Sequence, residues 1–113
     1  MKKYVFIVMT NAVQGREDEY NTWYTEKHLP DVLRIPGIVG AQRFKLASTQ
    51  RRDPPYPWQY AALYDIETES LQTTISALKA RSGTKDMPLS DAMAEEKLSY
   101  IFEPITARVV AKL

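Results

Sequence analysis

The chain has no cysteine, a single histidine and no long hydrophobic run. The absence of cysteine excludes disulfides, thiolate metal sites and cysteine nucleophiles. One imidazole does not make a metal-ligand set, and Glu17, Asp18 and Glu19 are consecutive rather than on one helical face, so we expect no metal. Neither a glycine-rich phosphate loop nor a recognisable serine or threonine nucleophile motif occurs, which argues against nucleotide-dependent and acyl-enzyme chemistry.

The charges are balanced, with 15 basic and 14 acidic side chains and a formal net charge of +1. Such a balance produces no field that would attract nucleic acid or an acidic membrane surface, so we expect neither partner. The apolar run in Tyr4–Thr10 is too short for a signal sequence or a membrane span, which predicts a cytoplasmic protein. No linker-like composition divides the 113 residues, so we expect one domain over residues 1–113.

The first half of the chain predicts a strand followed by a helix. Tyr4–Thr10 is rich in aromatic and β-branched residues, as in a buried strand. After Gly15 the pattern changes to a helical period that places several aromatic side chains and the histidine within an arc of about 140°. These residues are Tyr20, Trp23, Tyr24 and His28. Because Pro30 disfavours helical geometry at the residue before it, we expect the helix to end or kink there and a short helical segment to follow over Asp31–Ile35.

The second half predicts three more strands and another helix. The expected strands are Ile38–Leu46, Trp58–Asp65 and Tyr100–Val110, the last interrupted by Pro104. A helix capped by Thr68 or Ser70 carries Leu71, Ile75 and Leu78 at helical spacing and stops at Ser82-Gly83. We expect a polar loop over Ser48–Pro57 and a short helical segment over Pro88–Glu96.

This order of elements predicts a ferredoxin-like βαββαβ fold of the α+β class, with both helices on one face of an antiparallel sheet. The other face of the sheet would then be bare. Strands this rich in Tyr, Phe, Trp and Val would expose a large apolar patch there. We therefore expect a homodimer that packs through its sheet faces.

Several segments carry a family resemblance. Gly15–Tyr24, His28-Leu29-Pro30-Asp31, Pro36-Gly37 and Arg43-Phe44 resemble EthD-like members of the dimeric α+β barrel superfamily. The resemblance implies a ferredoxin-like subunit, a homodimer with a composite barrel, and a small-molecule pocket beside the first helix. Superfamily members include polyketide cyclases, muconolactone isomerases, cofactor-independent monooxygenases, haem-dependent enzymes and proteins with no known activity. In the family, a histidine precedes a proline at the end of the first helix, and His28 resembles that pocket residue. Several enzymes of the superfamily use more than one histidine, and this chain has no second one.

His28 is the first candidate for proton-transfer chemistry, because imidazole exchanges protons near neutral pH. Tyr24 lies one turn before it and Asp31 three residues after it, within reach if the helix stays regular. In the functional interpretation His28 moves a proton on the substrate, Asp31 orients the ring, and Tyr24 or Tyr60 donates to the developing oxyanion. An apolar, planar ligand would be held by aromatic residues. The candidates for substrate binding are Phe6, Tyr20, Trp23, Trp58, Tyr60 and Tyr64.

A structural interpretation competes with the functional one. His28 could cap the C-terminal end of the first helix and interact with its dipole, and the aromatic residues could be core or dimer interface only. The preferred function is cofactor-independent acid/base chemistry of the lyase, isomerase or cyclase type on an aromatic or polyketide-like carbonyl or phenolic substrate. The alternatives are a non-catalytic ligand-binding or accessory protein, and an oxygenase with or without haem, for which one axial histidine suffices.

Overall fold

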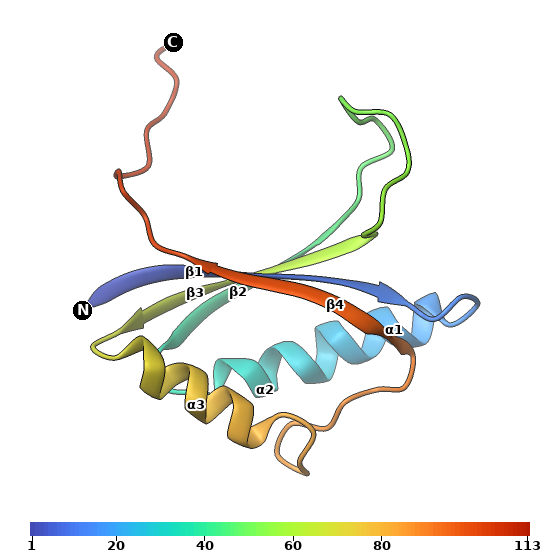
Figure 1. Ribbon diagram of the computed structural model, residues 1–113, viewed down its shortest axis with the longest axis horizontal. Helices are drawn as coiled ribbons and strands as arrows, with labels where there is room; N and C mark the ends of the chain where they lie inside the picture. Colours follow the sequence, from blue (N-terminus) through green and yellow to red (C-terminus); the bar gives the residue numbers. More distant parts are fainter.

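The computed structural model describes residues 1–113 and contains one antiparallel sheet with helices on one of its faces (Figure 1). The strands lie in the order β2-β3-β1-β4. In chain order the elements are β1 (Lys2–Ala12), α1 (Glu17–Trp23), the π-helical turn η1 (Tyr24–His28), α2 (Leu29–Leu33), β2 (Ile38–Lys45), β3 (Tyr60–Thr68), α3 (Leu71–Arg81) and β4 (Met93–Phe102). The predicted ferredoxin-like βαββαβ arrangement is confirmed.

Of the two outcomes expected at Pro30, the helix does not end there, and its regular α-helical geometry is instead interrupted by a π-helical turn just before the proline. Segments α1, η1 and α2 form one continuous helix, and the residues around the junction keep right-handed helical geometry. The Leu29 amide donates to the Tyr24 carbonyl five residues back, which is the π-helical pattern. In a regular α-helix the Pro30 ring would collide with the carbonyl of Glu26, four residues back. The wider π turn accommodates the proline without breaking the helix.

The fourth strand also differs from its prediction. Residues 88–96 do not form a helical segment, because β4 begins at Met93 and pairs with β1. The strand ends at Phe102 rather than Val110. The register pairs Val5 with Phe102, so continued pairing would place Pro104 opposite Lys3, where proline has no amide hydrogen to donate. The second helix begins as expected, since the Ser70 hydroxyl accepts from the Thr73 amide.

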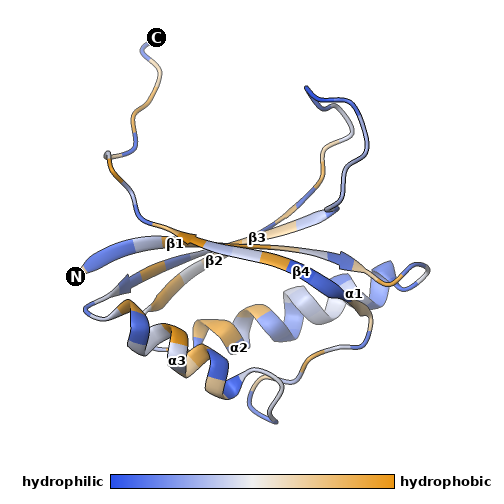
Figure 2. Ribbon diagram, in the orientation of Figure 1, coloured by the Kyte–Doolittle hydropathy of each residue, from blue (hydrophilic) through white to orange (hydrophobic).

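The two faces of the sheet differ in what covers them. Phe6 pairs with Tyr64 and Ile101 and faces the helices, where the core lies. Ile7, one residue on, pairs with Leu63 and Tyr100 and faces away from them. On this open face Tyr100 is 58% exposed and Phe102 54% exposed. The expected apolar sheet face is therefore present, and Figure 2 shows no helix on that side of the sheet.

Two segments without regular structure rise on the side of the open face (Figure 1). One is the loop between β2 and β3, and the other is the C-terminal stretch after Phe102. Ile105, Val109 and Val110 in the C-terminal stretch are each more than three-quarters exposed. None of the helices is long and apolar enough to cross a membrane.

Candidate functional site

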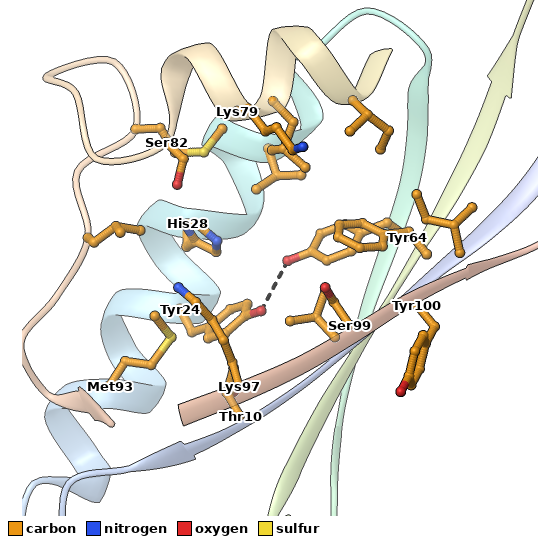
Figure 3. Close-up of a pocket in the computed structure, with 18 residues that line it drawn as sticks. Thr10, Tyr24, His28, Tyr64, Lys79, Ser82, Met93, Lys97, Ser99 and Tyr100 are labelled. Carbon is orange, nitrogen blue, oxygen red and sulfur yellow. Dashed lines mark hydrogen bonds between the residues drawn. The ribbon is translucent and has the colours of Figure 1, made fainter. Parts of the chain in front are cut away.

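A cavity of about 510 Å³ lies between the sheet and the helices (Figure 3). Twelve of its 18 lining residues are hydrophobic. Its polar groups come from different elements, which the fold brings together: Thr10 from β1, Tyr24 and His28 from η1, Tyr64 from β3, Lys79 from α3 and Ser82 just after it, and Lys97 and Ser99 from β4. A mostly apolar cavity of this size with a few convergent polar groups is typical of a small-molecule site.

His28 lies at this cavity and is held by aromatic side chains. Its ring stacks on Trp23 with centroids 4.7 Å apart and meets Tyr24 edge-on at 4.9 Å. The Trp23 indole donates to the Pro88 carbonyl at 3.2 Å, which anchors the stacking partner in turn. Because the helix continues past His28 to Leu33, the histidine is not at a helix end. The interpretation of His28 as a C-terminal cap is therefore wrong.

Burial lowers the pKa of His28 to about 4, since a charged imidazole loses its hydration there. The positive charges of Lys97 and Arg43 lower the pKa further, and the negative charge of Asp31 raises it. Nδ1 is fully enclosed and has no hydrogen-bond partner, so in the tautomer whose Nε2 can accept a proton the ring hydrogen sits on Nδ1 as a buried, unpaired N–H. His28 is thus a neutral imidazole at pH 7, and only Nε2 can serve a ligand.

Two tyrosine hydroxyls meet beside this imidazole (Figure 3). The Tyr64 hydroxyl donates to the Tyr24 hydroxyl at 3.2 Å, and both side chains are buried. Burial raises the pKa of each phenol, so both remain protonated at neutral pH. Since Tyr24 accepts from Tyr64, its own hydroxyl hydrogen is free to donate to a ligand oxygen in the cavity.

Asp31 takes a different position from the one assigned to it by sequence. Its carboxylate accepts a hydrogen bond from Arg34 and forms an ion pair with it. Asp31 does not line the cavity, and it makes no hydrogen bond to the His28 ring, whose Nδ1 has no partner. The carboxylate therefore acts on His28 through its charge alone, while Trp23 and Tyr24 orient the ring.

The six predicted substrate-binding residues divide into two groups. Phe6 and Tyr64 line the cavity, with ring centroids 5.7 Å apart. The other four lie outside its lining: Tyr20, Trp23, Trp58 and Tyr60. Tyr20 is fully buried, and its hydroxyl forms a 2.5 Å hydrogen bond with Thr10. Tyr60 packs on Tyr20 and does not line the cavity, so it is not placed to donate to an oxyanion there.

Sequence reasoning missed two basic residues near His28. Lys97 lines the cavity from β4. Arg43 comes from β2, at the opposite edge of the sheet, and its guanidinium lies 4.5 Å from the centre of the Tyr24 ring. The alternation Lys97, Ser99, Ile101 would have placed Lys97 on the helix-facing side if the strand had been recognised. Arg43 lies in a strand that the sequence predicted, but the alternation of residues in that strand does not show that Arg43 packs against Tyr24 of η1.

The fold and the cavity define the class as a ferredoxin-like α+β subunit with a small-molecule-sized cavity between sheet and helices. No protein-family model matches the chain, and no curated protein matches it in sequence. No three histidine or carboxylate side chains converge as a metal-ligand set would.

Solved structures, in contrast, match almost the whole chain. An EthD-like protein from Ralstonia eutropha JMP134 has 14% identity and a TM-score of 0.61, and the match covers 96% of each chain. A candidate antibiotic biosynthesis monooxygenase from Bordetella bronchiseptica has 15% identity and a TM-score of 0.64, covering 94% of this chain and 100% of that one. A variant of MhuD with two manganese protoporphyrin IX molecules bound per active site has 14% identity and a TM-score of 0.61, covering 95% and 99%. The resemblance to EthD-like proteins is confirmed at the level of the fold.

Proposed function

We propose that this protein binds a small, largely apolar or aromatic molecule and catalyses a cofactor-independent proton transfer on its carbonyl or phenol group. The reaction would be of the lyase, isomerase or cyclase type. The observation that supports this proposal is a neutral imidazole and a free phenol hydrogen at one mostly apolar cavity. The imidazole supplies a proton acceptor, and the phenol supplies a hydrogen-bond donor to the oxyanion that develops on the substrate.

The roles follow from the protonation states. Tyr24 donates to the substrate oxygen and stabilises the negative charge that develops on it, while Tyr64 holds the Tyr24 hydroxyl in place. His28 accepts the proton through Nε2 and returns it to another atom of the substrate. With its pKa near 4 the neutral imidazole is a weak base, and the imidazolium, once formed, gives the proton back readily. Asp31 assists through its charge, which favours the protonated ring.

The assembly that we propose is a homodimer closed through the open sheet face. Its support is the row of apolar side chains there, including Phe44, Tyr100 and Phe102, and the exposed C-terminal stretch that rises on the same side (Figure 1). Sedimentation at micromolar concentration should give about twice the subunit mass of 13.0 kDa. A mass near that of one subunit would contradict the dimer. The cytoplasmic location stays a prediction.

The test of function is solvent deuterium exchange, followed by NMR, at the acidic α-C–H groups of β-keto acids and at the ortho ring C–H groups of phenols, which exchange through the keto tautomer. Wild-type protein should accelerate the exchange of the substrates that it binds. His28→Gln should lose about 10²- to 10⁴-fold of that acceleration while keeping the fold and the ligand affinity. Lys45→Gln, on the edge strand β2 and outside the cavity, is the matched control and should leave the rate unchanged.

Two other results would redirect the proposal. Binding without any accelerated exchange would favour the non-catalytic ligand-binding protein. An oxygenase is the second candidate, favoured by the fold likeness to monooxygenase-named and porphyrin-binding proteins and by the neutral imidazole, whose lone pair could ligate an iron. An absorbance band that appears on adding hemin and is lost in His28→Ala would support the haem form of that candidate.

A further inference from the structure

The charged groups of the cavity are all of one sign. Among its 18 lining residues are Lys79 and Lys97, and there is no aspartate or glutamate. Neither lysine takes part in an ion pair. The protein as a whole is nearly neutral, so this local excess does not reflect the general composition. An apolar cavity with two uncompensated ammonium groups attracts an anion.

The lysines approach the cavity from different elements (Figure 3). Lys97 extends from β4 toward Tyr24 and His28, and Lys79 comes from α3 on the opposite side. Both lysines are exposed to solvent although they line the cavity. The charge of Lys97 reaches His28, because it contributes to lowering the pKa of the imidazole. An anionic group held by Lys97 would therefore lie close to the proposed proton acceptor.

We propose that the substrate is an organic monoanion, an apolar or aromatic body bearing one carboxylate, whose charge is bound by Lys97 with Lys79 as second cation. This inference rests on the proposed function and names the class of its substrate. The apolar walls from Phe6, Val8 and Ile101 receive the body, and the hydroxyl hydrogen of Tyr24 remains available for a carbonyl or phenol oxygen on it. The lysines position the substrate and take no part in the proton transfer.

The experiment compares two probes of almost equal shape, 2-naphthoate and the uncharged 2-naphthamide, by calorimetry at pH 7 and low salt. Wild-type protein should bind the carboxylate about fivefold to tenfold more tightly than the amide. Lys97→Gln should remove most of this preference by weakening naphthoate binding while leaving naphthamide binding unchanged, and Lys79→Gln should remove a smaller part. Lys45→Gln, outside the cavity, should retain the full preference. Salt should weaken naphthoate binding only.

The His28 imidazole reports where the anion sits. Naphthoate in the cavity should raise the pKa of the single histidine in an NMR titration, and naphthamide should not. Equal affinities for the two probes would overturn the anion inference and leave the small-molecule cavity standing. A carboxylate preference that survives in the Lys79→Gln, Lys97→Gln double variant would also overturn it, because the anion would bind elsewhere. If neither probe binds, the proposed function fails and this inference fails with it.

Discussion

Trp23 and His28 stack face to face, 4.7 Å between ring centroids, although they lie five residues apart on one helix. At about 100° per residue, an α-helix would separate them by about 140° around its axis. The π-helical turn η1, closed by the Leu29 amide on the Tyr24 carbonyl, brings residues five apart nearly above one another. The proline that follows His28 thus has a consequence for the site, because the turn that accommodates Pro30 also sets the orientation of the imidazole.

The first prediction concerns stability against pH. The pKa of His28 is about 4 in the folded protein and near 6.5 in the unfolded chain, so the unfolded chain binds a proton first as pH falls. Burial and the charges of Lys97 and Arg43 disfavour the folded imidazolium, and Asp31 offsets them in part. Above pH 6.5 the titration of His28 does not change the free energy of unfolding. Below pH 6.5 it lowers that free energy progressively, by about 3 kcal/mol at pH 4.

Urea unfolding at pH 7, 5.5 and 4 measures this effect. His28→Gln carries no titrating group, so its free energy of unfolding should fall less than that of wild type between pH 7 and pH 4. The difference between the two proteins isolates the histidine, because the carboxylates titrate in both. Parallel pH profiles would show that the imidazole is not desolvated in the folded state.

The second prediction concerns the hydroxyl pair of Tyr24 and Tyr64. Replacing either tyrosine by phenylalanine leaves the other buried hydroxyl without its partner, and each single variant should lose about 1 to 2 kcal/mol of unfolding free energy. In a double-mutant cycle the two changes should couple by about 1 kcal/mol. Under the proposed function, Tyr24→Phe should also slow the exchange reaction by about 10²-fold or more. Additive losses would contradict the hydrogen bond.

The third prediction compares two glycines that both have positive φ. Gly37 has φ +98°, and a Cβ there would lie 2.5 Å from the Thr74 hydroxyl oxygen, whereas Gly15 has φ +86° and open space around it. Gly15→Ala should cost about 1 kcal/mol of backbone strain, and Gly37→Ala about 3 kcal/mol because it adds the clash. Thermal unfolding measures both. Adding Thr74→Ala to Gly37→Ala should recover the clash part, and equal costs at the two glycines would refute the argument.

The fourth prediction concerns the charge of Asp31. Because this carboxylate raises the pKa of His28, Asp31→Asn should lower that pKa below its value of about 4 in an NMR titration. Glu26→Gln, on an exposed residue of the same helix, should leave it unchanged. An unchanged pKa in Asp31→Asn would show that the Arg34 ion pair screens the carboxylate completely. Stability should change by less than about 1 kcal/mol in either variant.

The element order could be predicted because it depends on local patterns. Ser70 before Leu71, Ile75 and Leu78 specifies the start and the face of α3 without reference to other parts of the chain. The limits of β4 could not be predicted in this way. They depend on which residues of β1 lie opposite, since Met93 pairs with Ala12 and Phe102 with Val5. Strand pairing is a long-range interaction that no local window contains.

The choice of His28 as site residue also came from local information, namely one imidazole on an aromatic helical face before a proline. The groups that surround His28 could not be predicted from local information. Asp31 pairs with Arg34, and Tyr60 packs on Tyr20 outside the cavity, while Lys97 reaches His28 from a strand about 70 residues later in the chain. Side-chain periodicity assigns a residue to a face. Protonation state and cavity lining depend on the groups that pack against that face, and these groups are brought together only when the sheet and helices assemble.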